Sequence, residues 1–147
     1  MAKAKKRVNK SPLSMREGEV YIDGVLVADS CAFQLVFTPK VWKGNTLSRK
    51  GTDRRYIGYD ITGKIKEWKT NNRLRTVVNQ YIKNGETPEF TITGICDDKN
   101  SDYYQKNGTD KVTAIGCVFE GDLTLMDLDT DGEVVKENID FGAFDLA

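Results

Sequence analysis

Residues 54–85, RRYIGYDITGKIKEWKTNNRLRTVVNQYIKNG, combine a long strand pattern with a helix pattern, and the other segments can be arranged around them. Apolar and polar side chains alternate from Arg54 to Trp68. The odd positions carry Ile57, Tyr59, Ile61 and Ile65, and the even positions between them carry Asp60, Thr62, Lys64 and Lys66. This period of two predicts one strand with a buried and a wet face, much longer than the usual ~5–6 residues.

The second half of this segment predicts an amphipathic helix. Its apolar stripe follows the spacing i, i+3, i+4, i+7 and i+8 and is expected to face the core: Leu74, Val77, Val78, Tyr81 and Ile82. Asn71 or Asn72 can cap its start, and Gly85 suits the left-handed residue after its end. No other segment gives a convincing helix pattern, so we expect one helix.

The remaining segments predict strands and polar loops. Asp23-Gly24 between two apolar runs predicts a hairpin, and residues 31–38 predict a strand that Pro39 ends. Further strands are expected at residues 88–96, 111–126 and 137–144, with polar loops at 40–53 and 97–110 and an acidic turn at 127–133. We therefore expect a mainly β, mostly antiparallel fold, a sandwich or partial barrel with one α-helix.

The chain of 147 residues is long enough for one domain with its own core. Residues 1–18 are basic and are expected to form a flexible tail, and residues 19–147 a single domain. No apolar run approaches the ~18 residues of a membrane span, so we expect no stable membrane insertion. Cys31, Cys96 and Cys117 lie far apart in strand-like segments, which indicates buried thiols.

The charges are balanced in number, 22 basic against 22 acidic residues, but they are separated along the chain. The charged residues within 40–75 are mostly basic, and those from Cys117 onward are mostly acidic. One interpretation is that these are simply solvated faces. The other is that the basic end of one copy meets the acidic end of the next, as in rings or filaments. The contact candidates are Val41, Trp42, Lys43, Leu47, Arg49, Lys50, Arg54, Arg55, Asp127, Asp129 and Asp131.

No pattern indicates catalysis, a metal or a cofactor. The sequence contains no histidine, the commonest general base, and no nucleophile or phosphate-loop motif. Residues 127–132 match the first half of a calcium-binding loop, but Asn138 stands where the bidentate Glu belongs, which favours an acidic turn. The separated charges and two strands that are too long for an isolated small domain favour a structural, self-assembling protein. The alternative is a β-barrel module that binds single-stranded nucleic acid through Tyr56, Tyr59 and Trp68.

Several segments together resemble a known family. These are REGEVYIDGVLVADS at residues 16–30, CAFQLVFT at 31–38, IKEW at 65–68, VVNQYIKNGETPEFTITGICDD at 77–98 and KVTAIGCVFEGDLTLMDLD at 111–129. Their order is similar to that of tail tube proteins of phages and defective prophages of Gram-positive bacteria, the PBSX type with contractile tails. The resemblance covers residues 17–147.

The resemblance implies rings of six copies, joined through their sheets and stacked into a hollow tube inside a contractile sheath. The implied partners are further copies, the sheath protein, the baseplate or tube initiator, the tape-measure protein, and DNA in transit in a phage. A tail-like bacteriocin would carry no DNA. The implied location is a virion tail or tail-like particle assembled in the bacterial cytoplasm. The wet strand faces supply the lumen candidates Gln34, Asp60, Thr62, Lys64, Asp122 and Thr124.

Overall fold

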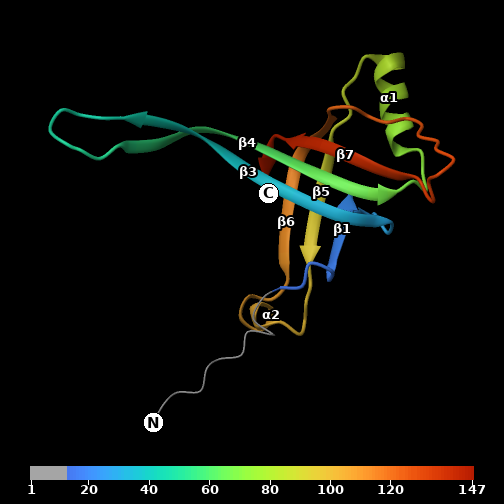
Figure 1. Cartoon of the computed structure of the whole chain (residues 1–147), viewed down its shortest axis with the longest axis horizontal. Coiled ribbons are helices and arrows are strands. Elements are labelled where there is room, and N and C mark those ends of the chain that lie inside the picture. The colour runs from blue at the N-terminus through green and yellow to red at the C-terminus, as the bar shows by residue number, and fades with distance from the viewer. Residues whose placement is uncertain (1–12) are drawn as a thin grey trace, which may run out of the picture.

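The computed structural model describes residues 13–147 (Figure 1). Along the chain the elements are β1 (Gly18–Ile22), β2 (Val25–Leu26), β3 (Ser30–Gly44), β4 (Asp53–Trp68), α1 (Arg73–Asn84), β5 (Phe90–Cys96), α2 (Asp102–Asn107), β6 (Asp110–Glu120), β7 (Lys136–Ala143) and β8 (Asp145–Leu146). The expected boundary between tail and domain at residue 18 remains a prediction, and residues 1–12 lie outside the described part.

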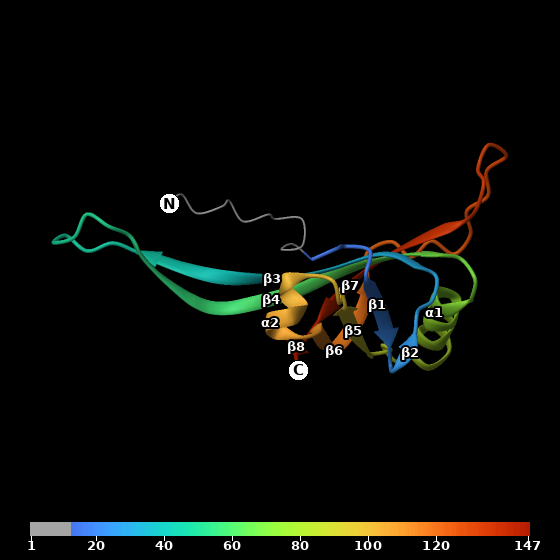
Figure 2. The ribbon, with the colours of Figure 1, turned by 90° about the horizontal axis from the view of Figure 1, so that it is seen from below.

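All strand pairs are antiparallel, in the order β2-β1-β5-β6-β7-β4-β3, with β8 on β6. The strands form two layers that cross each other (Figures 1 and 2). We call β2, β1, β5, β8 and most of β6 the β5 layer, and β3, β4, β7 and the end of β6 the β4 layer. β6 belongs to both layers: it pairs with β5 as far as Cys117 and with β7 from Val118, and Gly116, with a φ of 64°, allows the bend just before this change. The mainly antiparallel β fold is confirmed.

The core lies between these layers and under the start of α1. It is built by Val20, Ile22, Ile65, Leu74, Ile92, Ala114, Cys117, Phe119, Ile139 and Phe141. Gly63 is required in this packing, because a Cβ there would stand 2.3 Å from Phe141 Cζ and 2.7 Å from the Gln34 carbonyl oxygen. Two-layer burial of this kind explains why the alternation of residues 61–68 is so regular.

The hairpin at Asp23-Gly24 is confirmed, with both residues at positive φ. The prediction that the next strand ends at Pro39 is wrong: β3 continues to Gly44, and Pro39 pairs with Tyr59. β3 is the edge strand of its layer, and an edge strand tolerates proline because part of its backbone N–H groups face away from the sheet. The expected loop at 40–53 therefore shrinks to residues 45–52.

The burial predicted for the odd positions of β4 holds only in its second half. Ile61 and Ile65 are buried, whereas Ile57 and Tyr59 are exposed, because β7 pairs with β4 only from Ile61 onward. Cys31 is also exposed and Cys96 is half-buried, so the buried thiol prediction holds for Cys117 alone.

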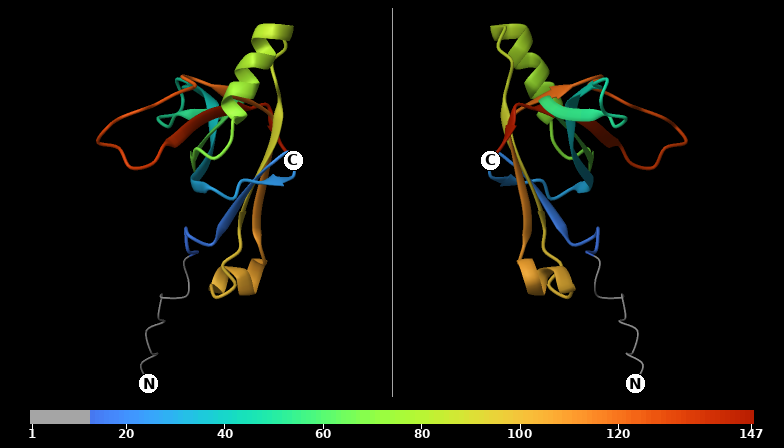
Figure 3. Two further views of the ribbon diagram at one scale, coloured as in Figure 1. Left: turned by 90° about the vertical axis from the view of Figure 1, so that its right-hand side faces the viewer. Right: turned by 90° about the vertical axis from the view of Figure 1, so that its left-hand side faces the viewer.

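α1 has the predicted bounds, and Gly85 takes the left-handed conformation after its end. Leu74 is buried and Val77 and Val78 are half-buried, but Tyr81 and Ile82 are exposed, because the end of α1 extends beyond the layers (Figure 3). The prediction of a single helix was wrong. A second one, α2, follows Ser101, whose hydroxyl accepts a hydrogen bond from the Tyr104 N–H and caps the helix.

Candidate assembly interface

β3 and β4 form a hairpin that projects far beyond the two layers (Figures 1 and 2). The two strands pair from Ser30 with Glu67 to Gly44 with Asp53, and the pairing shifts by one residue between Lys40 and Val41. The neighbour β7 ends opposite Ile61, so the outer half of the hairpin is a ribbon of two strands alone. Such a ribbon is marginally stable in isolation and leaves both backbone edges open.

The projecting hairpin exposes many large apolar side chains. They are Phe37, Val41, Trp42, Leu47, Tyr56, Ile57 and Tyr59. Phe37 stacks on Tyr59 with ring centroids 5.4 Å apart. Trp42 folds over Gly44, where a Cβ would stand 2.3 Å from the ring, and lines a shallow hollow with Arg55, Tyr56 and Ile57. An exposed apolar surface of this extent is typical of an interaction site.

The same hairpin carries an unbalanced positive charge. Its basic residues are Lys40, Lys43, Arg49, Lys50, Arg54 and Arg55, and all of them are exposed. Within residues 13–147, the ion pairs are those of Lys69 with Glu137 and of Arg73 with Glu67, and neither involves the hairpin. These cations are therefore available to a partner.

The acidic segment lies in an exposed loop, residues 121–135, between β6 and β7. Asp129 accepts a hydrogen bond from the Asp131 N–H at 3.0 Å and from the Gly132 N–H, through its backbone carbonyl, at 3.2 Å. This Asx turn uses the Asp129 carboxylate inside the loop. Asp127, Asp129 and Asp131 remain exposed, next to the exposed apolar side chains Met126, Leu128 and Val134. The described residues contain no group of three or more side chains that could hold a metal ion.

The hairpin and the acidic loop lie at opposite ends of the long axis of the molecule (Figure 2). Each end combines exposed apolar side chains with an excess of one charge, positive on the hairpin and negative on the loop. The structure thus places the predicted basic contact candidates together at one end and the three predicted aspartates together at the other.

The outer face of the β4 layer contains four of the six lumen candidates. Gln34 on β3 pairs with Lys64 on β4. Asp60 and Thr62 lie on the same face of β4 as Lys64, and all four residues are at least partly exposed. Asp122 and Thr124 were expected on the same strand face, but β6 ends at Glu120 because Gly121 takes a φ of 72°. Both residues lie in the loop instead.

Sequence reasoning missed two acids on this outer face. Lys64 is opposite Asp140, and Asp140 is opposite Glu120, so Gln34, Lys64, Asp140 and Glu120 form one row across four strands. The even-numbered polar positions of residues 137–144 were the signal for Asp140. The position of Glu120 depends on the register of β6 against β7, which local patterns do not give.

The three aromatic side chains of the alternative nucleic-acid-binding module are spread along β4. Tyr56 and Trp68 are twelve residues apart, roughly 40 Å along a strand. Tyr59 lies between them, stacked on Phe37, and its hydroxyl donates to Asp145 at 3.3 Å. The Asp145 carboxylate raises the pKa of Tyr59.

No described helix is long and apolar enough to cross a membrane.

Comparisons with known proteins give the class of this chain. Residues 6–146 match the family model described as phage tail tube protein, so the chain belongs to the phage tail tube protein family. It is 26% identical over 129 residues to the phage-like element PBSX protein XkdM of Bacillus subtilis (strain 168), which covers 88% of this chain and 84% of the relative. YqbM of the same organism, an uncharacterized protein, matches equally well.

The fold is similar to that of chains in contractile injection systems. A chain from the PVC sheath/tube terminator in its extended state has a TM-score of 0.72 at 10% identity, with 95% of this chain and 97% of that chain covered. A chain from the PVC sheath-tube complex has a TM-score of 0.71 at 9% identity, with 95% and 93% covered. The protein is therefore a structural, non-enzymatic component of a phage tail or tail-like particle.

Proposed function

We propose that copies of this chain join laterally into rings, six to a ring, and that the rings stack into a hollow tube within a contractile sheath. The observation that carries this proposal is the projecting hairpin, with its exposed apolar side chains, unpaired cations and open strand edges. A monomer leaves these features uncovered, whereas a neighbouring copy can cover the apolar side chains and pair the edges.

The polarity of the molecule supports contacts of a head-to-tail kind. The basic hairpin of one copy would meet the acidic loop of a copy in the next ring, where Trp42 and Leu47 could pack against Met126 and Leu128. Contacts between two different surface patches generate rings or open filaments, and opposite charges fix their register. The domain that assembles would be residues 19–147.

The outer face of the β4 layer is the proposed lumen lining. Its row of Gln34, Lys64, Asp140 and Glu120 carries one positive and two negative charges. The two acids offset Lys64, so this face would not hold a phosphate backbone tightly. Such a tube suits either passage of DNA in a phage or penetration of an envelope by a tail-like bacteriocin. The sheath protein, a tube initiator and a tape-measure protein would be its other partners, and assembly would take place in the host cytoplasm.

Electron microscopy of the purified protein at rising concentration tests this function. The full chain should form uniform rings or tubes, in the presence of a purified initiator complex if it needs one. A variant lacking residues 45–52, with a two-residue Asn-Gly turn in their place, should stay folded by circular dichroism and form no stacked tubes. Normal tubes from this variant would show that the hairpin tip does not join rings.

A further inference from the structure

Two buried carboxyl groups face each other across β4 and β7. Glu67 and Glu137 are directly opposite in the strand register and are 1% and 3% exposed. Glu67 comes two residues after the buried Ile65 and Glu137 two residues before the buried Ile139, so both lie on the core-facing side of these strands. Like charges directly opposite in a sheet repel each other, and buried charges are unfavourable unless they are closely paired.

The cations near this pair do not compensate both carboxylates equally. Arg73 Nη1 donates to both carboxylate oxygens of Glu67, at 2.9 Å each. Lys69 Nζ stands 3.5 Å from Glu137 Oε1 and donates its hydrogen bond to the Leu125 carbonyl at 2.8 Å. Within the described part of the chain, Glu137 Oε2 is buried without a hydrogen-bond partner. A single proton on the pair would remove one of the two buried negative charges.

The other charged groups around the pair leave this imbalance in place. Asp29, in the turn before β3, accepts a hydrogen bond from the Thr70 hydroxyl. Lys136 precedes Glu137 on β7, and its exposed side chain points to the other face of the strand. Burial raises the pKa of Glu67 above its ordinary value, and the Glu137 carboxyl adds to this rise, while Arg73 opposes it.

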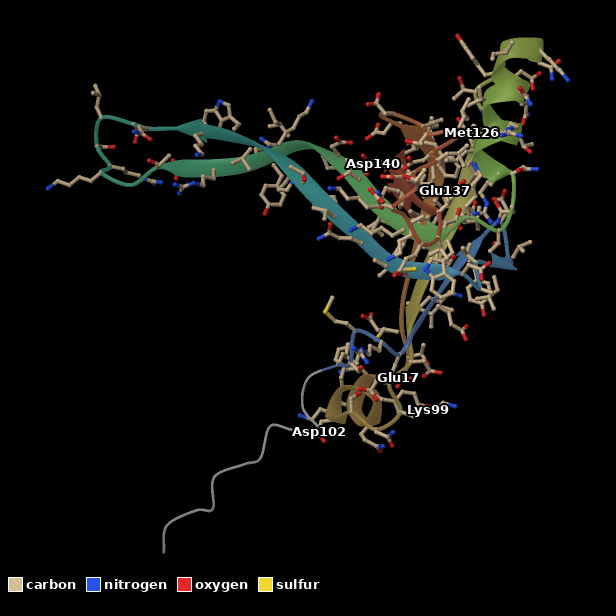
Figure 4. All side chains as sticks on the ribbon, turned by 45° about the vertical axis from the view of Figure 1, so that its right-hand side comes forward. Glu17, Lys99, Asp102, Met126, Glu137 and Asp140 are labelled. Atoms are coloured by element: carbon tan, nitrogen blue, oxygen red, sulfur yellow. The ribbon has the colours of Figure 1, made fainter. Side chains whose placement is uncertain are left out.

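The pair also lies where three parts of the chain are joined. Arg73 is the first residue of α1, and it reaches back to Glu67 on β4. Lys69 is linked to the acidic loop twice, through its side chain to Leu125 and through its backbone N–H to the Val135 carbonyl at 2.9 Å. Figure 4 shows Glu137 on β7 in the crowded body of the molecule, away from the projecting hairpin.

We propose that Glu67 and Glu137 form a proton-binding pair, and that its state of protonation controls how firmly α1 and the acidic loop are attached to the sheet. With one proton bound, Arg73 balances the single negative charge that remains. When the proton leaves, only the more distant Lys69 can balance the second charge, and the attachment loosens. This inference concerns the folded subunit itself and stands whether or not the subunit builds tubes.

The direction of the pH effect follows from the raised pKa. A carboxyl group that holds its proton more tightly in the folded than in the unfolded chain stabilises the fold fully below its unfolded pKa. That contribution is lost as the pH rises through the folded pKa, which for Glu67 lies above 4.5. The pair should therefore weaken the fold progressively as the solution moves from acid toward neutral pH.

Thermal unfolding of the full chain between about pH 5 and pH 8 tests this, with Glu137→Gln as the variant. Its amide is neutral at every pH and can donate to Glu67, so relative to wild type the variant should gain ~3 °C or more in Tm toward neutral pH. The matched control is Glu120→Gln, which alters the exposed cross-strand pair of Glu120 on β6 and Asp140 on β7. It should give a Tm difference that does not change with pH. Equal pH dependence of the two variants would overturn the proposal.

Carbon-13 NMR titration of the glutamate carboxyl groups gives an independent result that needs no variant to fold well. We expect one buried glutamate in the wild-type chain to titrate above the ordinary range. The α1 amides, after correction for intrinsic exchange, should lose protection from hydrogen exchange over the same pH interval, and the β5 amides should not. Ordinary titration of every glutamate would overturn the proposal.

Discussion

Phe33 of β3 lies directly over Gly94 of β5, so closely that a Cβ on Gly94 would stand 2.5 Å from Phe33 Cε1. The contact joins the two layers near the point where the edge strand β3 passes over the β5 layer. Phe33 is itself only half-buried and stacks on Phe141 with centroids 6.3 Å apart. The absence of a side chain at Gly94 therefore lets the aromatic ring close this end of the core.

Gly94→Ala should destabilise the chain by about 1–3 kcal/mol, because the added methyl forces Phe33 out of its position. Urea denaturation monitored by circular dichroism measures this. Gly51→Ala is the matched control, since no atom lies within 4 Å of a Cβ at that position, and it should change stability by less than ~0.5 kcal/mol. Adding Phe33→Leu to Gly94→Ala should restore part of the loss. If the two alanine variants were equally stable, the contact would not contribute as described.

Trp42→Ala should impair assembly far more than folding. Trp42 is 52% exposed in the single chain, but an aromatic anchor that becomes buried between subunits typically contributes ~2–4 kcal/mol. The concentration needed for tube formation should rise at least tenfold, which sedimentation measures, while the Tm changes little. Val25→Ala, at an exposed apolar position outside both ends of the molecule, is the control and should assemble normally. Unchanged assembly by Trp42→Ala would remove this residue from the interface.

Reversing the charge of the hairpin should block stacking, and reversing the charge of the acidic loop in the same chain should compensate for it. Changing Arg49, Lys50 and Arg54 to Glu should block stacking, since the hairpin would then repel an acidic loop. Changing Asp127, Asp129 and Asp131 to Lys in the same chain should restore stacking in part. Light scattering at rising salt follows both, and the wild-type contact should weaken as salt screens it. Failure of the second set of changes to rescue the first would show that these two surfaces do not meet.

The three thiols should react at clearly different rates in the unassembled chain. Cys31 is exposed, Cys96 is half-buried and Cys117 is fully buried. Burial also raises the pKa of the Cys117 thiol, which lowers the fraction of reactive thiolate. We expect reaction with a disulfide reagent at mildly alkaline pH in the order Cys31, Cys96, Cys117, read from the single Cys→Ser variants. Fast labelling of Cys117 would indicate that the core opens readily.

The sequence predicted well those elements whose pattern is set by local packing. The regular alternation of residues 61–66 reflects burial between two layers, and Gly85 ends α1 because it can take a positive φ. The exposure of Ile57, Tyr59, Tyr81 and Ile82 could not be predicted, because it depends on where β7 and the layers end. Apolar side chains in a regular pattern look the same in a sequence whether they face a core or a future partner.

The candidate interface was predicted in part for the same reason. The charged residues of both ends were found from composition, since like charges gather there along the chain. The strand end predicted at Pro39 was wrong, because proline is rare inside strands and is tolerated here on an edge strand. The buried pair of Glu67 and Glu137 was missed, since their opposition is created by the register of β4 against β7.

The most direct test of the structural role is the composition of tubes from cells that produce the chain. Tail-like particles would be purified, stripped of their sheath, imaged by negative-stain electron microscopy and analysed by mass spectrometry. We expect bare tubes with a uniform ring repeat in which this chain is the main protein. Intact tubes that lack this chain would contradict its assignment as the tube subunit.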